Sequence, residues 1–193
     1  MGHQGFYFNM AACIGCKTCQ VACKDKNNLD IGIIFRRVRH FETGVYPTPG
    51  VFYFSGACNH CANPKCVEGC PTGAMHIAED GTVQHDVDKC IGCRYCIWNC
   101  PYGAPQFIPE LGKIGKCDSC KDLRDQGLNP VCVDACVMRA IEWGNLDELR
   151  AKHAREQLTS DLPILPSSSI AGPSLLINPR IAAKQKEYKE KAV

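Results

Sequence analysis

Cysteine is the residue type in this sequence with the clearest chemical potential. Sixteen of the 193 residues are cysteines, about 8%, a level at which a disulfide or metal-binding framework becomes the leading interpretation. They form four groups of four with none left over: Cys13, Cys16, Cys19, Cys23; Cys58, Cys61, Cys66, Cys70; Cys90, Cys93, Cys96, Cys100; Cys117, Cys120, Cys132, Cys136. Each group begins as C-x2-C and ends as C-x3-C. Thiolates at this spacing can wrap a cubane iron–sulfur cluster, so the sequence predicts one-electron redox chemistry.

The fourth cysteine of each group is expected on a short helix that carries it away from the preceding loop. In two-cluster ferredoxins this cysteine ligates the other cluster of the pair. Proline follows it in the second and third groups, as Pro71 and Pro101, whereas Lys24 and Val137 stand there in the first and fourth. This difference pairs the second group with the third and the first with the fourth. The prediction is four [4Fe-4S] clusters: cluster 1 on Cys13, Cys16, Cys19, Cys136; cluster 2 on Cys23, Cys117, Cys120, Cys132; cluster 3 on Cys58, Cys61, Cys66, Cys100; cluster 4 on Cys70, Cys90, Cys93, Cys96.

The elements that must position these cysteines also repeat. β-Prone residues precede the groups at 6–8, 51–54, 82–84 and, more weakly, 113–115. A strand, a cysteine loop and a short helix make up one half of a bacterial ferredoxin, and this unit occurs four times in the sequence. The sequence therefore predicts an α+β fold of two bacterial-ferredoxin-like modules, one nested in the other. The expected boundaries are 1–35 and 105–153 for the outer module, 50–104 for the inner module, 36–49 for a connecting excursion and 154–193 for an extended C-terminal arm.

The segments between the groups have their own local signals. Residues 24–57 contain two β-prone runs separated by Pro and Gly, which predict a hairpin-like excursion. Residues 121–131 predict a helical turn that ends at Gly127. Residues 145–157 predict an amphipathic helix with Asn145 as its N-cap and with Leu146 and Leu149 on one face.

The composition changes in the C-terminal part. Residues 158–180 carry four prolines and three consecutive serines, together with apolar residues such as Ile164 and Leu176. We expect this segment to lie as an extended arm over a partner subunit, and a disordered tail is the alternative. Residues 184–191 are expected to form a solvated end.

Other metal or disulfide chemistry fits the pattern less well. A disulfide framework suits a small secreted scaffold and does not need three cysteines at two-residue intervals. Structural zinc uses C-x2-C hooks, but a third cysteine followed by C-x3-C would be superfluous around a tetrahedral ion. A three-iron cluster usually follows the loss of a ligand, and no ligand is missing here. The sequence also lacks a nucleophile–base pair, a Walker loop and a dinucleotide-binding glycine motif, so we expect no catalytic site.

Charge and hydropathy limit the partners and the location. The formal charge of +2 counts every cysteine as neutral. Four cubanes bound by thiolates, each about −2, bring the total to about −6, which disfavours nucleic acid. No run approaches the roughly 18–20 apolar residues of a membrane span, and residues 1–10 do not have the pattern of a secretory signal. Arg36-Arg37 lies in a β-prone run and does not read as an export signal. We expect a soluble chain that a partner would have to anchor or export.

Two further residues are candidates for tuning cluster 4. His76 follows Cys70 by six residues, and Arg94 is adjacent to Cys93. A nearby cation or hydrogen-bond donor raises a cluster's reduction potential, and either residue could also bind a quinol beside the cluster. The alternative is that both have only a surface or supporting role. His60 and His85 have weaker claims, and Trp98 is expected to pack over a cluster.

The chain resembles the iron–sulfur subunits of molybdopterin oxidoreductases, most closely the dimethyl sulfoxide reductase type. The similarity covers about residues 5–153. Its motifs lie at 13–25, 58–66, 70–76, 90–96, 100–106 and 116–120, and the pattern continues to 147–150. The resemblance implies a non-catalytic electron-transfer subunit. It also implies a large catalytic partner with molybdenum or tungsten in a bis-pterin cofactor and, in many members, an integral membrane subunit that exchanges electrons with menaquinol.

The resemblance carries three more expectations. Cluster 1 would face the catalytic subunit and cluster 4 the membrane side. Some relatives bind a three-iron cluster because tryptophan replaces the second cysteine of the third group; Cys93 stands at that position here, so four cubanes are expected. The protein would lie at the cell membrane within a complex, exported with its catalytic partner, and a cytoplasmic complex is the alternative. A free polyferredoxin shuttle and a zinc-stapled adaptor remain as competing functions.

Overall fold

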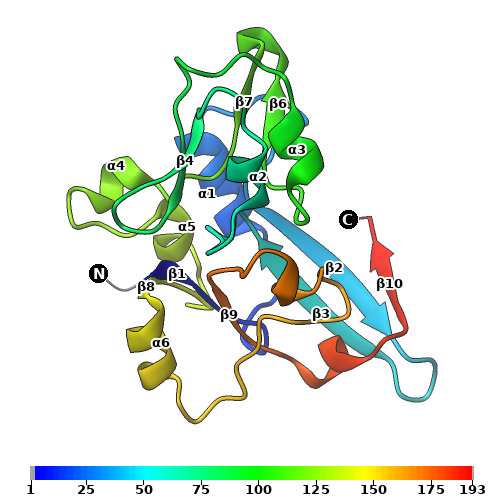
Figure 1. Ribbon diagram of the computed structural model, residues 1–193. Helices are drawn as coiled ribbons and strands as arrows, with labels where there is room; N and C mark the ends of the chain where they lie inside the picture. The colour runs from blue at the N-terminus through cyan, green and yellow to red at the C-terminus, as the bar shows by residue number, and fades with distance from the viewer. Residues whose placement is uncertain (1–2, 193) are drawn as a thin grey trace.

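Four small β-sheets and six short helices make up the part of the chain that the computed structural model describes, residues 3–192. One three-stranded sheet has the order β8-β1-β9, with β1 at Gln4–Asn9, β8 at Ile141–Asn145 and β9 at Leu175–Asn178. The second has the order β10-β2-β3, with β2 at Arg37–Thr43, β3 at Gly50–Gly56 and β10 at Tyr188–Lys191. Both lie in the lower half of Figure 1.

Two two-stranded ladders lie in the upper half of the same view (Figure 1). β4 at Met75–Ile77 pairs with β5 at Val83–His85, and β6 at Gln106–Ile108 pairs with β7 at Lys113–Gly115. The predicted lead-in strands are therefore present: 6–8 lie in β1, 51–54 in β3, 82–84 overlap β5 and 113–115 form β7. The predicted hairpin is the β2–β3 pair, whose antiparallel register joins Arg37 to Gly56 and Thr43 to Gly50.

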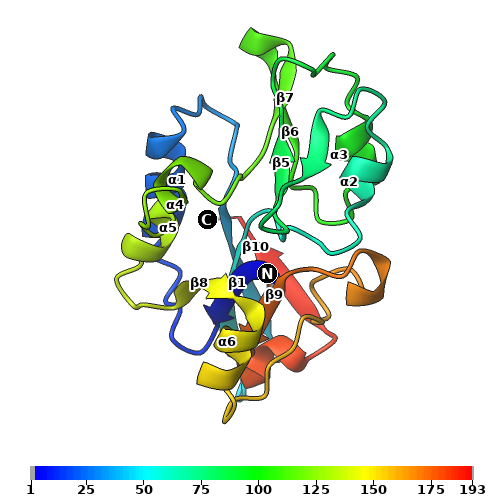
Figure 2. The ribbon, with the colours of Figure 1, turned by 60° about the vertical axis from the view of Figure 1, so that its left-hand side comes forward.

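Four helices carry cysteines. They are α1 at Thr18–Lys26, α2 at Lys65–Glu68, α3 at Tyr95–Asn99 and α5 at Val131–Asp134. Each contains the third cysteine of its group, and the fourth lies in the helix or within two residues of its end. α1 packs against α5, and α2 packs against α3. Figure 2 shows α1, α4 and α5 on one side of the molecule and α2 and α3 on the other.

The remaining helices agree with local sequence signals. α4 at Lys121–Arg124 is the expected turn before Gly127, whose φ is +76°. α6 at Leu146–Lys152 begins at the predicted cap, because the Asn145 side chain accepts hydrogen bonds from the N–H groups of residues 147 and 148. Leu146 and Leu149 are buried, as the amphipathic pattern predicted. Three 3₁₀ turns, η1 at Pro109–Leu111, η2 at Ser168–Ile170 and η3 at Ile181–Lys184, complete the elements.

The expected C-terminal arm is wrong in one respect, because residues 154–192 pack on their own chain. Leu175–Asn178 form β9 parallel to β1, and Leu175, Leu176 and Ile177 are buried. A continuous apolar run of this kind is typical of a strand buried on both faces. The end at 184–191 is exposed as expected, but it is ordered: it contains β10, which pairs with β2 and makes a bidentate contact between Arg39 and Glu190 at 2.6 and 2.8 Å. Residue 193 lies outside the described part of the chain.

Candidate iron–sulfur sites

Two small cavities are each lined by four cysteines from two different groups. The first is lined by Cys13, Cys16, Cys19 and Cys136. The second is lined by Cys70, Cys90, Cys93 and Cys96. In both, three thiols come from one loop and the helix that follows it, and the fourth lies just after another helix. The fourth cysteine is more than a hundred residues away in sequence for Cys136 and about twenty for Cys70. These are the sets predicted for clusters 1 and 4.

The other eight cysteines gather in the same crossed manner. Burial raises the pKa of the Cys23 thiol, and the nearby thiols of Cys117, Cys132 and Cys120 raise it further. Burial likewise raises the pKa of Cys61 to about 12, with additional contributions from Cys58, Cys100 and Cys66. Thiols that influence one another in this way must lie close together. The thiols nearest to Cys23 and Cys61 are thus the other members of the sets predicted for clusters 2 and 3, and Cys58 and Cys117, from different sets, also influence each other.

The chemistry of each set suits an iron–sulfur core. None of the sixteen cysteines is in a disulfide. Among residues 3–192, no three His, Cys, Asp or Glu side chains are arranged to hold one metal ion. In the two sets with a resolved cavity, the thiols instead surround a volume. Burial raises the pKa of Cys96 and Cys120 to about 11, so these thiols need a strong Lewis acid to become ligating thiolates at neutral pH.

The loops between the first two cysteines of each group share one backbone feature. The residue just before the second cysteine has a positive φ in all four: +71° at Gly15, +43° at His60, +68° at Gly92 and +59° at Ser119. This left-handed conformation turns the backbone tightly between two ligands. Gly92 has a second requirement, because a Cβ there would lie 2.2 Å from the carbonyl oxygen of Gly112. The sequence indicated this turn at the two glycines and gave no sign of it at His60 and Ser119.

The exits from three groups also direct backbone N–H groups at sulfur. The N–H of Met75 lies 3.4 Å from Cys70 Sγ, that of Ala104 lies 3.4 Å from Cys100 Sγ, and that of Ala140 lies 3.2 Å from Cys136 Sγ. Hydrogen bonds to ligand sulfur help to set the potential of iron–sulfur clusters. The recurring alanine four residues after the fourth cysteine marks this turn in the sequence.

The C-terminal segment supports one of the cysteine loops directly. The N–H groups of Ala62 and Asn63 donate to the carbonyl oxygens of Gly172 and Ala171, at 2.7 and 2.9 Å. The Ser174 hydroxyl donates to the His60 carbonyl at 2.7 Å. The loop that holds Cys58 and Cys61 is therefore hydrogen-bonded to a segment more than a hundred residues later in sequence.

The residues expected to tune cluster 4 are placed differently from each other. Met75 and His85 face each other across the β4–β5 ladder, and both line the cavity of the cluster 4 set. His76 is the next residue along β4 and is exposed, because successive side chains of a strand point to opposite faces. The Arg94 guanidinium lies over the ring of Phe107, 3.8 Å from its centroid. His85, with the weaker claim in the sequence, thus borders the cavity, and the tuning roles of His76 and Arg94 stay predictions.

Buried donors without a protein partner lie beside several of the cysteines. Among the described residues these include Nε and Nη2 of Arg36, Nε2 of His85 and the Tyr102 hydroxyl. His85 borders the cluster 4 cavity. Burial raises the pKa of Tyr102 to about 12, and Cys61, Asp161 and Cys100 contribute further. Buried donors are normally satisfied, and the sulfur atoms of a cluster would supply acceptors at these places.

Lys116 is a buried cation that the sequence did not reveal. Its Nζ donates to the carbonyl oxygens of Val83 and of Cys117, the latter at 3.0 Å. Its charge opposes the burial that raises the pKa of Cys58 and Cys66. Lys116 therefore lies beside the cluster 3 set, and its contact with the Cys117 carbonyl places it where Cys58 of that set and Cys117 of the cluster 2 set influence each other.

The four sets differ in their exposure to solvent. Cys16 and Cys93 are the exposed cysteines of the chain, and they belong to the cluster 1 and cluster 4 sets. The cluster 2 set consists entirely of buried cysteines. An exposed isoleucine lines each of these two cavities: Ile14, at 54% exposure, lies with Cys16, and Ile91, at 67%, lies with Cys93. Trp98, which was expected to pack over a cluster, is 83% exposed and is not among the residues that line the cluster 4 cavity.

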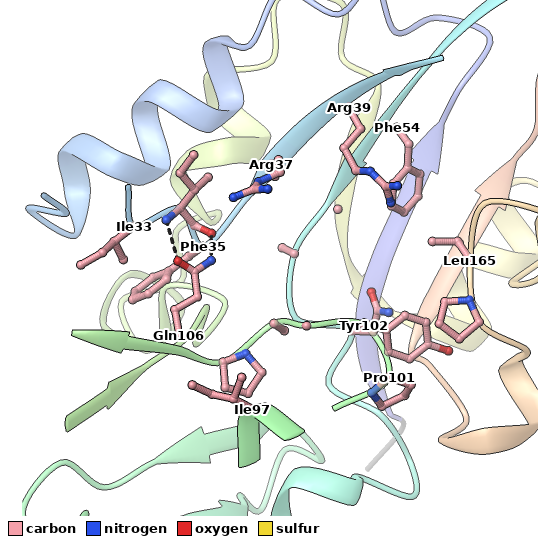
Figure 3. A pocket seen from close by; sticks show the side chains of 18 of the residues that line it. Ile33, Phe35, Arg37, Arg39, Phe54, Ile97, Pro101, Tyr102, Gln106 and Leu165 are labelled. Carbon is pink, nitrogen blue, oxygen red and sulfur yellow. Dashed lines mark hydrogen bonds between the residues drawn. The ribbon is translucent and has the colours of Figure 1, made fainter. Parts of the chain in front are cut away.

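A groove of about 840 Å³ runs between the β2–β3 hairpin and the segment that follows Cys100 (Figure 3). Arg37, Arg39 and Phe54 line one side, and Pro101 and Tyr102 line the other. At one end the Gln106 side chain hydrogen-bonds both the N–H and the carbonyl of Ile34, the first at 3.0 Å (Figure 3).

In residues 3–192 we find no helix with the length and apolar character needed to cross a membrane.

Comparisons with known proteins agree with these observations. Residues 50–146 match the family model of a 4Fe-4S dicluster domain. The B component of anaerobic dimethyl sulfoxide reductase from Escherichia coli (strain K12) is 43% identical, over 91% of this chain and 88% of the relative. The corresponding component from Haemophilus influenzae is 40% identical over 95% and 93%, and that of the sulfite dehydrogenase from Allochromatium vinosum is 35% identical over 72% and 68%. The chain therefore belongs to the family of non-catalytic iron–sulfur subunits of the anaerobic dimethyl sulfoxide reductase type.

Proposed function

We propose that this protein binds four [4Fe-4S] clusters and relays electrons between a large catalytic subunit and a second redox partner. The observation that carries this proposal is the exposure pattern. The cluster 1 and cluster 4 sets each present one exposed cysteine, whereas the other two sets contain only buried and half-buried ones. A cluster supplies one-electron transfer when bound, and two accessible ends with a covered middle suit a relay between two proteins.

The ligand sets are those that the spacing predicted. Cluster 1 is assigned to Cys13, Cys16, Cys19 and Cys136, and cluster 4 to Cys70, Cys90, Cys93 and Cys96; the two cavities support both. The electrostatic grouping of the other thiols supports clusters 2 and 3. The packing of α1 on α5 and of α2 on α3 supports two nested ferredoxin-like modules.

The proposed partners follow from the family. The relatives are named as one component, designated B, of a dimethyl sulfoxide reductase and of a sulfite dehydrogenase, which supports a separate catalytic subunit here. We propose that this subunit holds molybdenum or tungsten in a bis-pterin cofactor. A membrane subunit linked to quinol is proposed as the second partner, which would place the protein at the membrane surface.

A free polyferredoxin shuttle is the competing function. An arm wrapped around one partner would have argued against it, but the C-terminal segment packs on its own chain. The argument for a fixed subunit therefore rests on the relatives. Purification under anaerobic conditions separates the two functions: a large molybdenum- or tungsten-containing protein should remain bound in stoichiometric amount, and its absence would favour the shuttle.

Single cysteine variants test the ligand sets. Wild-type protein should contain about sixteen iron and sixteen acid-labile sulfide per molecule. In electron paramagnetic resonance, Cys136→Ser should lose or alter the same signal as Cys16→Ser, although the two lie in different groups. Cys132→Ser is the matched control and should instead affect the signal altered in Cys120→Ser. If Cys136→Ser and Cys120→Ser affect the same signal, the crossed assignment is wrong.

A further inference from the structure

Arg36 is a fully buried cation in the middle of the outer cysteine sets. Its exposure is 2%, and its guanidinium lies over the ring of Phe6, 4.5 Å from the centroid. Nη1 donates to the carbonyl oxygen and to the hydroxyl of Ser55, both at 3.2 Å. Nε and Nη2 have no hydrogen-bond partner of ordinary geometry among the described residues, and the guanidinium lies close enough to the Cys132 thiol to interact with it. A buried guanidinium without a counter-charge is costly, so this arrangement requires a negative group beside it.

The groups that surround Arg36 are thiols. Burial by itself lowers the pKa of Arg36, but Cys132, Cys117, Cys19 and Cys23 reverse the direction and raise it. No carboxylate within residues 3–192 forms an ion pair with Arg36. The Ser55 hydroxyl, which accepts a hydrogen bond from Nη1 of Arg36, also lies 3.4 Å from Cys19 Sγ. The counter-charge that Arg36 lacks is therefore available from cluster ligands in their thiolate form.

The four thiols are divided unequally between two clusters. On the proposed assignment Cys132, Cys117 and Cys23 ligate cluster 2, and Cys19 ligates cluster 1. We propose that Arg36 is a positioning residue that bridges clusters 1 and 2, donates its free N–H groups to their sulfur atoms and raises both reduction potentials, that of cluster 2 the more. This inference rests on the proposed ligand sets.

The direction of the effect follows from charge. Reduction adds one electron to each cluster, and a fixed cation nearby stabilises the more negative state. The planar guanidinium can reach several acceptors at once. Lys116 differs, because its Nζ already donates to two main-chain carbonyl oxygens. Of these two buried cations, Arg36 is therefore the one whose N–H groups remain available to donate to the sulfur atoms of clusters 1 and 2.

The neighbouring arginine provides a matched control. Arg37 begins β2 and is exposed, whereas Arg36 is buried. Arg37→Gln removes the same charge one residue away without touching the thiols. Arg36→Gln removes the buried positive charge and most of the N–H donors of the guanidinium. Arg36→Lys keeps the charge and loses the planar arrangement of donors.

The experiment is a potentiometric titration of each variant in its complex, followed by electron paramagnetic resonance. Signals are assigned with the cysteine variants, and iron and sulfide are counted in every preparation. In Arg36→Gln the equilibrium for reduction of cluster 2 should weaken at least tenfold, which is about 59 mV for a one-electron couple. Cluster 1 should fall by less, and clusters 3 and 4 should match the wild type. Arg36→Lys should give a smaller fall, and Arg37→Gln none.

Several results would overturn the proposal. One is an Arg36→Gln protein with full iron content and wild-type potentials. Another is an equal shift of all four clusters, or a shift no larger than that of Arg37→Gln. If Arg36→Gln does not assemble, Arg36→Lys decides: a lowered cluster 2 potential supports the bridge, and unchanged potentials refute it. Fewer than four clusters in the wild type would instead refute the proposed function, and the bridge with it.

Discussion

The two parts of the molecule that hold the predicted cluster pairs are built from different material. The outer part, defined by the sheets β8-β1-β9 and β10-β2-β3, surrounds its cysteines with large apolar side chains, and Phe8, Phe41, Phe52 and Ile177 are at most 2% exposed. The inner part is taken here as residues 58–115 and not as the expected 50–104, because β3 pairs with β2 and Ile114 packs with Cys66 and Cys96; it has only two-stranded ladders. Its core consists of Met75, Val83 and Ile114 around Cys66 and Cys96.

This difference predicts a division of labour in stability. A three-stranded sheet with a hydrophobic face can contribute cohesion of its own, whereas isolated two-stranded ladders are marginal in water. Metal binding that occurs only in the folded state becomes folding free energy. The inner part should therefore depend on its clusters more than the outer part does.

Removal of iron should have the largest effect. With a chelator and reductant under anaerobic conditions, amide protection in β4–β5 and β6–β7 should fall at least 100-fold, about 2.7 kcal/mol. Protection in β1 and β8 should fall less, because their apolar core remains. Hydrogen exchange with mass spectrometry resolves the two parts, and untreated protein is the control. An equal loss of amide protection in the two parts would show that the inner part does not depend on its clusters more than the outer part does.

The apolar core of the outer part predicts the next effect. Ile177 lies in β9 and is fully buried, whereas Ile181 in the following 3₁₀ turn is 84% exposed. Ile177→Ala should lower the opening free energy of the β1 amides by about 2–5 kcal/mol. Ile181→Ala is the matched control and should change it by less than about 0.5 kcal/mol. Similar effects of the two substitutions in hydrogen exchange would mean that the C-terminal segment does not stabilise the outer part.

A polar link between the two parts predicts the smallest effect. Arg124 in α4 pairs with Asp80, in the turn between β4 and β5, at 2.7 Å. Burial alone would raise the pKa of Asp80, but the Thr82 hydroxyl and Arg124 lower it to about 2. Arg124→Met should lower the opening free energy of the β5 amides by about 1–2 kcal/mol. Arg150→Met, which breaks an exposed pair with Asp147, should change it by less than about 0.5 kcal/mol.

The pH dependence of this link has a definite sign. The ordinary pKa of Asp80 is 3.8, and its folded value is about 2. Its contribution is therefore complete above pH 4 and is lost as the pH falls from about 4 to about 2. The difference between wild type and Arg124→Met should be the same at pH 8 and pH 6. A difference that changes over that range would assign the effect to another group.

Local sequence signals predicted the elements around the cysteines. Phe6–Phe8 and Val51–Phe54 lie in strands, and Asn145 caps α6 as its position suggested. Local signals failed where a distant segment decides the outcome. The run at 175–177 was taken for an arm because nothing nearby in sequence shows that β1 lies beside it. His60 has a left-handed backbone although its residue type does not require one.

The sequence alone determined that this protein has four sets of cysteines, the chemistry of cubane clusters and the family to which it belongs. Thiolate spacing is a constraint between near neighbours, and it can be read without knowledge of the fold. Only the tertiary structure decided which cations and donors are buried among the thiols. The sequence showed Arg36 only as half of a twin arginine in a β-prone run, whereas in the fold it is buried near cysteines from both ends of the sequence. Burial and electric field depend on every segment that packs around a group, so they emerge only when distant parts of the sequence meet.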